Sequence, residues 1–384
     1  MNAEEIRRIS LHIRDHRQAL KLPREELGKL LQLHPIEAIA FDDGNFPNLD
    51  GDHLLTVARF LRVDFRRLLF ESWAKEREPV LTLLNSQEFS PADRFAIQEW
   101  VQMVEWKRML EHRLGMPAKE TMRYLFEAPK SHPEMVEQAT YAAGRERERL
   151  NLGGEPLNIF GLLNHVGVSV FRRKLEDPRI SSILFRHPSA GMAVLINRVE
   201  DHSRERFSAA HEYAHILLDP DLPIHLTRLG GGEWFEARAN VFAANLLLPA
   251  SVFEGMDRSL ADDPDRLVQA CQALAQKHLV NGMVALMRFI ELGWLPQEKI
   301  PSLMSRPELR TPLVPPFDPV LPFKLPDDKK KAFEPLGHRG ISWEYLSLVC
   351  RAYREALISR AKMGELLFMP EQEAFQHGRE VGLL

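Results

Sequence analysis

The chain has 384 residues, enough for two or three domains that each bury a core of their own. Its formal charge of −4 gives no overall attraction to nucleic acid or to an anionic membrane surface, and its two cysteines exclude a disulfide framework and suit a reducing cytoplasm. The N-terminus lacks the apolar stretch of a signal peptide and no apolar run approaches membrane-spanning length, so we expect a soluble, cytoplasmic protein.

The first predicted domain covers residues 1–72 and is helical. Helical patterns occupy residues 24–31, 34–41, 53–61 and 63–70. This order of helices, with a short turn at 32–34, resembles the Xre/Cro-type helix-turn-helix domain.

The helix that would read DNA in such a domain is poorly suited to do so. Its exposed positions are expected to hold Ile36, Glu37, Ile39 and Ala40, followed by two aspartates. Recognition helices instead present Arg, Lys, Asn, Gln or Ser to base edges. We therefore favour a scaffold or protein-docking role for this domain, and sequence-specific DNA binding stays open as the less supported alternative.

Residues 73–152 are predicted to form a helical connector. A long helix from Ser90 to Leu114 carries Trp and Met at helical spacing, which indicates packing rather than a cofactor site. A second helix, from Glu134 to Leu150, contains the alternating charges of residues 145–149, which are typical of a solvated face.

Residues 153–298 are predicted to be a domain that begins with a short sheet. Strand patterns cover residues 168–172, 180–185 and 192–197, and a turn signal lies at 187–191. We expect one of these three strands to be the sheet edge that binds extended peptide as an added strand.

The run His211-Glu212-Tyr213-Ala214-His215 follows this sheet and carries the chemistry. Two histidines four apart on a helix share one face and can reach one zinc ion. Glu212 would lie beside the metal, where a carboxylate can act as the base that takes a proton from water. No Gly or Pro occurs between Arg204 and Leu218, and Ser203 is a candidate N-cap of the helix.

A third ligand is expected from the next helix. Glu236 lies 21 residues after His215, which leaves room for a glycine-rich turn at 230–232 between the two helices. Asn240, one turn later, is expected to orient the ligand glutamate. The alternative is that Glu236 is an ordinary acidic residue in the first turn of a helix.

These segments resemble the ImmA/IrrE family of metallo-endopeptidases. The resemblance covers about residues 157–293 and is carried by the run from Arg206 to Leu218 and by the run from Glu236 to Pro249. It implies that His211, His215 and Glu236 bind the metal and that Glu212 is the base. Many members have a histidine where this chain has Asp219. Of the other histidines, His187, His202 and His225 are expected in solvent-facing loops, with His225 best placed to reach an oxyanion.

The remaining residues complete an α+β chain, mostly helical, with a zincin-like catalytic domain and an N-terminal helix-turn-helix bundle. Residues 299–341 are rich in Pro and are predicted to be an extended linker, and residues 342–384 a C-terminal helical cap.

The function implied is that of a zinc-dependent endopeptidase. The family resemblance implies cleavage of a partner repressor or antitoxin that switches on a stress, mobile-element or defence response, and we expect that partner to be of helix-turn-helix type. Two alternatives stay open. One is a DNA-binding regulator whose peptidase-like domain serves as a sensor or interaction surface, and the other is a zinc hydrolase of small amides.

Overall fold

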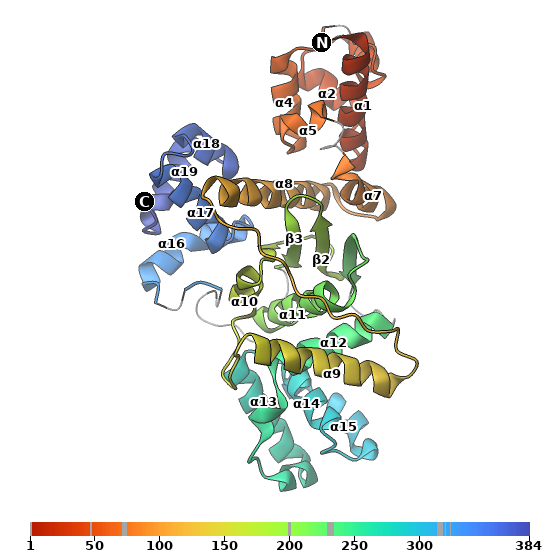
Figure 1. Cartoon of the computed structure of the whole chain (residues 1–384), viewed down its shortest axis with the longest axis vertical. Coiled ribbons are helices and arrows are strands. Elements are labelled where there is room, and N and C mark those ends of the chain that lie inside the picture. Colours follow the sequence, from red (N-terminus) through yellow and green to blue (C-terminus); the bar gives the residue numbers. More distant parts are fainter. Residues whose placement is uncertain are drawn as a thin grey trace.

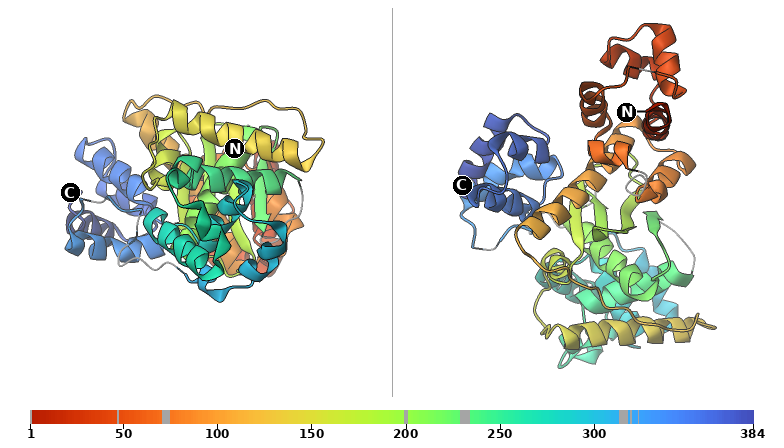
Figure 2. Two further views of the ribbon diagram at one scale, coloured as in Figure 1. Left: turned by 90° about the horizontal axis from the view of Figure 1, so that it is seen from below. Right: turned by 45° about the horizontal axis from the view of Figure 1, so that its top comes forward.

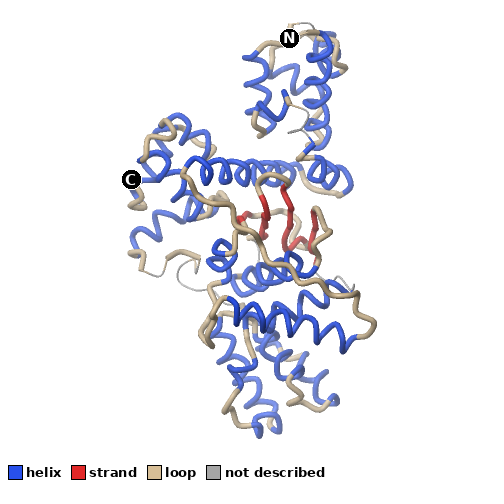
Figure 3. Tube along the Cα trace, in the orientation of Figure 1, coloured by secondary structure: helices blue, strands red, loops and turns tan. Residues whose placement is uncertain are grey.

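The computed structural model describes residues 2–46, 48–70, 75–198, 201–228, 234–312, 318, 320–322 and 324–384. The chain is mostly helical with one small mixed sheet near its centre (Figures 1 and 3), which confirms the α+β class. Among the described residues no helix is long and apolar enough to cross a membrane.

The N-terminal helices form a bundle at one end of the molecule (Figure 1), around an apolar cluster of their own. They are α1 (Ala3–Ala19), α2 (Arg24–Leu30), α3 (Pro35–Asp42), α4 (Gly51–Leu61) and α5 (Phe65–Leu69). The sequence predicted two exposed aspartates at the end of α3, and only Asp43 is exposed. Asp42 is buried and accepts two hydrogen bonds of 2.8 Å from Arg17 of α1, so it is not available to a binding partner.

The connector contains α7 (Glu78–Ser86), α8 (Pro91–Arg113) and α9 (His132–Arg149). The Trp and Met side chains of α8 lie in the core, as predicted. The prediction of a solvated charged face on α9 is wrong in part, because Glu146 and Arg147 are buried. Glu146 accepts hydrogen bonds from the hydroxyls of Tyr124 and Tyr213, and Arg147 donates to the Leu246 and Gly153 carbonyls, so the charges tie α9 to its neighbours.

The sheet has four strands in the order β1-β3-β2-β4, and the strands are β1 (Ser169–Arg173), β2 (Ile180–His187), β3 (Gly191–Asn197) and β4 (Ile224–Arg228). β1 runs parallel to β3, and the other two pairs are antiparallel. Alternate residues of β2 point to opposite faces, with Ile183 and Phe185 in the core on the α8 side and Leu184 in the core on the α11 side. Helices therefore cover both faces, which explains the continuous apolar strands.

β4 was not predicted. Its sequence, Ile224-His225-Leu226-Thr227-Arg228, alternates apolar and polar residues over only five positions, and we assigned it to a connection between helices. It pairs with β2 alone among the described strands and is therefore an edge of the sheet, together with β1. β1, one of the three predicted strands, and β4 are thus the two edges of the described sheet, and which of them binds extended peptide stays a prediction.

The helices that carry the candidate ligands, and the helices that pack near them, lie on both sides of the first three strands in the chain. α10 (Ile159–His165) precedes β1, whereas α11 (His202–Leu218), α12 (Trp234–Leu247), α13 (Pro264–His278) and α14 (Gly282–Glu291) follow β3. α11 lies along the sheet, and α12 packs between α11 and α9 (Figure 1). The predicted glycine-rich turn at 230–232 lies outside the described residues.

Residues 299–341 are not an extended linker throughout. They contain α15 (Ile300–Met304), a 3-10 turn (Pro307–Arg310) and α16 (Asp327–His338). The prolines that suggested extension stand partly in first turns of helices, where a missing N–H costs nothing.

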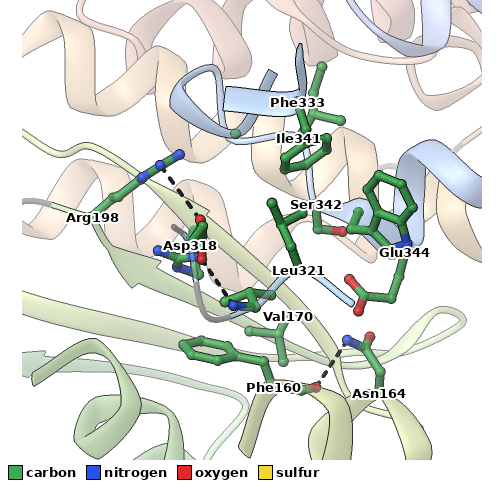
Figure 4. Close-up of a pocket in the computed structure, with 14 residues that line it drawn as sticks. Phe160, Asn164, Val170, Arg198, Asp318, Leu321, Phe333, Ile341, Ser342 and Glu344 are labelled. Atoms are coloured by element: carbon green, nitrogen blue, oxygen red, sulfur yellow. Dashed lines mark hydrogen bonds and ion pairs between the residues drawn. The ribbon is translucent and has the colours of Figure 1, made fainter. Parts of the chain in front are cut away.

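The C-terminal cap consists of α17 (Trp343–Arg354), α18 (Arg360–Leu366) and α19 (Glu371–Glu380), of which α19 was not predicted. It lies beside α8 in every view (Figures 1 and 2) and shares one apolar cluster with it. A small cavity of about 20 Å³ lies where the cap meets β1 and α10 (Figure 4). Asp318 joins its wall through Arg172 and Arg198, and none of His211, His215 and Glu236 lines it.

Candidate metal centre

α11 presents the first two candidate ligands. Its N-cap is Asp201, whose carboxylate accepts from the backbone N–H groups of Ser203 and Arg204, so the prediction of Ser203 as the cap is wrong by two residues. Its last turn is held by Arg186 of β2, which donates to the carbonyls of His215, Ile216 and Asp219. A cation at this end also complements the helix dipole.

His211, His215 and Glu236 form a compact buried cluster. One ligand atom from each lies within 4.8 Å of the others. The two Nε2 atoms are 3.0 Å apart, and the Glu236 carboxylate lies 3.2 Å from His211 Nε2 and 3.5 Å from His215 Nε2. Ligand atoms at zinc-bond length in a tetrahedral site are separated by about 3.3 Å. The three predicted ligands therefore converge with a spacing that fits zinc.

Both imidazoles are turned toward the centre by partners at their other nitrogen. His211 Nδ1–H donates to Asn240 Oδ1 at 2.9 Å, and His215 Nδ1–H donates to Asp219 Oδ2 at 2.9 Å. Arg238 holds Asp219 in turn, at 2.6 Å. Such partners fix the tautomer that leaves Nε2 for a metal. Asn240 thus orients a histidine, not Glu236 as we expected.

Glu212 is fully buried and points to the sheet. Its Oε1 accepts from Ser182 Oγ of β2 at 2.5 Å and from Thr227 Oγ1 of β4 at 2.6 Å. Its Oε2 is buried and has no hydrogen-bond partner among the described residues. One oxygen is therefore fixed by two hydroxyls and the other is left to exchange a proton.

His225 lies inside this site and not in a solvent-facing loop. It is a residue of β4, and its Nε2 lies 2.8 Å from Glu236 Oε1, so it supports the third ligand. The Phe235 ring packs against His215 and His225, at centroid distances of 5.7 and 5.6 Å. His187 is also buried, 3.1 Å from Glu105 of α8, which corrects a second loop assignment.

The charges of the cluster shift its titration. Burial raises the pKa of Glu236, but hydrogen bonds from His211, His215 and His225 outweigh it and hold that pKa well below its usual range. Burial lowers the pKa of His215, but its hydrogen bonds to Asp219 and Glu236 raise it to about 9. Without a metal, these opposite charges hold the cluster together, and the donor set of two imidazoles and one carboxylate is typical of zinc.

The structure brings together all four residues predicted from the sequence, and it adds others that sequence reasoning missed. Asp219 could have been found, because it lies four residues after His215 on the same helix face. Ser182 and Thr227 gave no signal, since isolated hydroxyls in strands are common and β4 was not recognised.

An open groove of about 610 Å³ passes the cluster at His211 and Glu236. Polar residues outnumber apolar ones in its lining, with Ser181, Arg204, Ser208, Thr227, Arg228, Asn240, Asn281 and Arg310 among the polar residues and Phe207, Met283, Val284 and Pro312 as the apolar ones. Such a groove can admit an extended chain, whereas a site for small amides alone would not need this length.

Comparison with known proteins agrees with this geometry. Residues 163–289, about a third of the chain, match the family model of peptidase M78, described as the IrrE N-terminal-like domain. This match supports the resemblance to the ImmA/IrrE family over the segment that carries the cluster, and it indicates a metallopeptidase-type hydrolase domain. No curated protein matches the sequence.

Proposed function

We propose that this chain is a zinc-dependent endopeptidase, with His211, His215 and Glu236 as the ligands. The observation that carries the proposal is the convergence of three ligand atoms within 4.8 Å beside a buried glutamate that has one oxygen without a partner. A zinc ion held there would act as a Lewis acid on a peptide carbonyl and on the attacking water. The M78 family match at the same residues supports this reading.

In this mechanism Glu212 moves the protons. Ser182 and Thr227 fix its Oε1, so Oε2 takes a proton from the attacking water and passes it to the leaving amine. β4 is the edge strand beside the cluster and is suited to hold an extended substrate through backbone hydrogen bonds. Asp219 and Asn240 are positioning residues that keep the two imidazoles aimed at the centre.

We further propose that the substrate is a repressor or antitoxin of helix-turn-helix type. The N-terminal bundle would bind this substrate. α3 exposes Ile36 and Ile39, and it has no basic residue among its eight positions. A surface of this kind suits a protein contact better than a phosphate backbone. Cleavage of such a partner would switch on a stress, mobile-element or defence response.

To test this proposal, the zinc-loaded full chain is incubated with purified helix-turn-helix repressors that are encoded beside it. Mass spectrometry then identifies the new termini of any cleaved repressor. The Glu212→Gln variant is the control, because it keeps all three ligands. In parallel, a gel-shift assay measures whether the full chain binds the DNA upstream of its own gene. Binding of DNA without cleavage of any repressor would favour the regulator alternative and overturn the proposal.

A further inference from the structure

A second pocket adjoins the metal centre at the C-terminal end of α11. Its volume is about 370 Å³, and most of its lining is apolar, from Leu125, Phe126, Leu218, Leu222 and Phe235. Leu125 and Phe126 belong to an extended segment between α8 and α9, outside the stretch that matches the M78 family. The pocket is therefore built partly by this chain's own connector.

This pocket lies beside the metal centre, although none of His211, His215 and Glu236 lines it. Phe235 immediately precedes Glu236, and its ring packs on His215 and His225. Asp219, which accepts the hydrogen bond from His215 Nδ1, also lines the pocket. The polar groove described above lies along the N-terminal half of the same helix. A chain that passes the cluster along α11 therefore meets a polar groove on one side and the apolar pocket on the other.

Leu125 is held outward by neighbours that are themselves fixed. The Tyr124 N–H donates to the Leu217 carbonyl at 2.8 Å, and the Tyr124 hydroxyl donates to Glu146 at 2.8 Å. The Phe126 ring packs on the rings of Tyr124 and Tyr141, at centroid distances of 6.3 and 6.2 Å. Leu125 nevertheless remains 85 % exposed. Because Leu125 also lines the pocket, its exposed side chain is available to an apolar group that enters there.

We propose that this pocket is a specificity subsite that binds a bulky apolar side chain of the peptide substrate, Leu, Met or Phe, within a few residues of the cleaved bond. The inference rests on the proposed peptidase function. The extended substrate is the occupant, because Phe235 and Asp219 line the pocket and also contact His215, which places the pocket within reach of residues near the cleaved bond. Burial of one such side chain against Leu125 and Phe126 contributes to binding without touching the reacting atoms.

The test uses the zinc-loaded full chain and internally quenched peptides in which one position at a time is varied. We expect preference for a bulky apolar residue at one position on one side of the cleaved bond. Leu125→Ser should lower kcat/KM for the preferred peptides about five- to tenfold, mainly through KM, and leave peptides with Ser at that position unchanged. Met122→Ser is the matched control, since Met122 is an exposed apolar residue of the same segment that does not line the pocket.

A second measurement separates failure of this inference from failure of the proposed function. The same peptides, fluorescently labelled, are bound to the Glu212→Gln variant with and without Leu125→Ser, and anisotropy is recorded. One outcome is that the wild type cleaves none of the peptides, and yet apolar peptides bind the Glu212→Gln variant more tightly when Leu125 is present. In that case the apolar subsite is supported and the peptidase assignment is wrong. If no position prefers an apolar residue, or if Leu125→Ser and Met122→Ser have equal effects in both assays, the subsite does not exist.

Discussion

Apolar side chains are usually buried and polar ones exposed, and two helix pairs of this molecule depart from this rule in opposite ways. In α11 and α12 the buried face carries His211, Glu212, His215 and Glu236, which are polar or charged. In α2 and α3 the exposed face carries Ile36, which is 71 % exposed, and Ile39, both on α3. Burying a polar group is costly unless it has a partner, and two exposed isoleucines on one helix leave apolar surface in water. In the proposed function the first pair carries the chemistry and the second the contact with a partner.

The two departures from this rule are supported differently. Each of His211, Glu212, His215 and Glu236 has at least one polar partner, although Oε2 of Glu212 has none among the described residues. The apolar groups on α3 have no such support. A chemical site is therefore specified by many hydrogen bonds, whereas a docking face is specified only by which side chains are left outside.

The largest expected effect is that of Glu212→Gln. Loss of the general base should lower kcat at least about a hundredfold, because the amide cannot take the proton. Zinc content, measured by plasma mass spectrometry, should stay at that of the wild type, since the three ligands are untouched. If this variant cleaved its substrate at the rate of the wild type, the buried polar face of α11 would have a structural role only.

Asp219→Ala tests the supports of the catalytic pair. Without Asp219 the ring of His215 loses its hydrogen bond at Nδ1, and zinc affinity should fall about ten- to a hundredfold. Competition with a chromophoric chelator measures this. Asp52→Ala removes the same charge from an exposed position on α4 and should leave zinc affinity unchanged.

The docking face is tested by Ile36→Ser combined with Ile39→Ser. Cleavage of an intact protein substrate should slow about tenfold, as expected for loss of two apolar contacts, while cleavage of short peptides is unchanged. The free energy of unfolding should change by less than about 0.5 kcal/mol, because both side chains are exposed. Leu55→Ser with Phe65→Ser is the control, since these exposed apolar residues lie on α4 and α5. Equal slowing in both doubles would remove the special role of α3.

The sequence predicted most of the helices in both pairs. It did not predict β4 or the contacts of the buried charges of α9. The pairing of His211 with His215 follows from spacing, because the α-helical period places residues four apart on one face. Glu212 follows from its place within the same motif, and Glu236 from the next helical run and the family resemblance. The helices of the N-terminal bundle follow from apolar periodicity, to within two residues for α2 to α5. β4 could not be predicted, since five residues of weak alternation become a strand only when β2 offers its edge. The burial of Glu146 and Arg147 likewise depends on partners far along the chain, Tyr213 and Leu246, which no local pattern reveals.

The smallest effect is expected at the packing of α2 on α3. A Cβ at Gly28 would lie 2.8 Å from the Cβ of Ala38, so Gly28→Ala forces the two helices apart. We expect a loss of about 1 kcal/mol, the net of overpacking and the gain in helix propensity. Hydrogen exchange of the α2 and α3 amides measures it without requiring the whole chain to unfold in one step.

Gly144→Ala is the matched control for that variant, since Gly144 lies in α9 with nothing within 4 Å of its added Cβ. It should be neutral or stabilise α9 by up to about 1 kcal/mol. If Gly28→Ala slows exchange in α2 and α3 as Gly144→Ala does in α9, the two helices are not closely packed. The exposed face of α3 would then follow from a loose helix and not from a rigid surface held out for a partner.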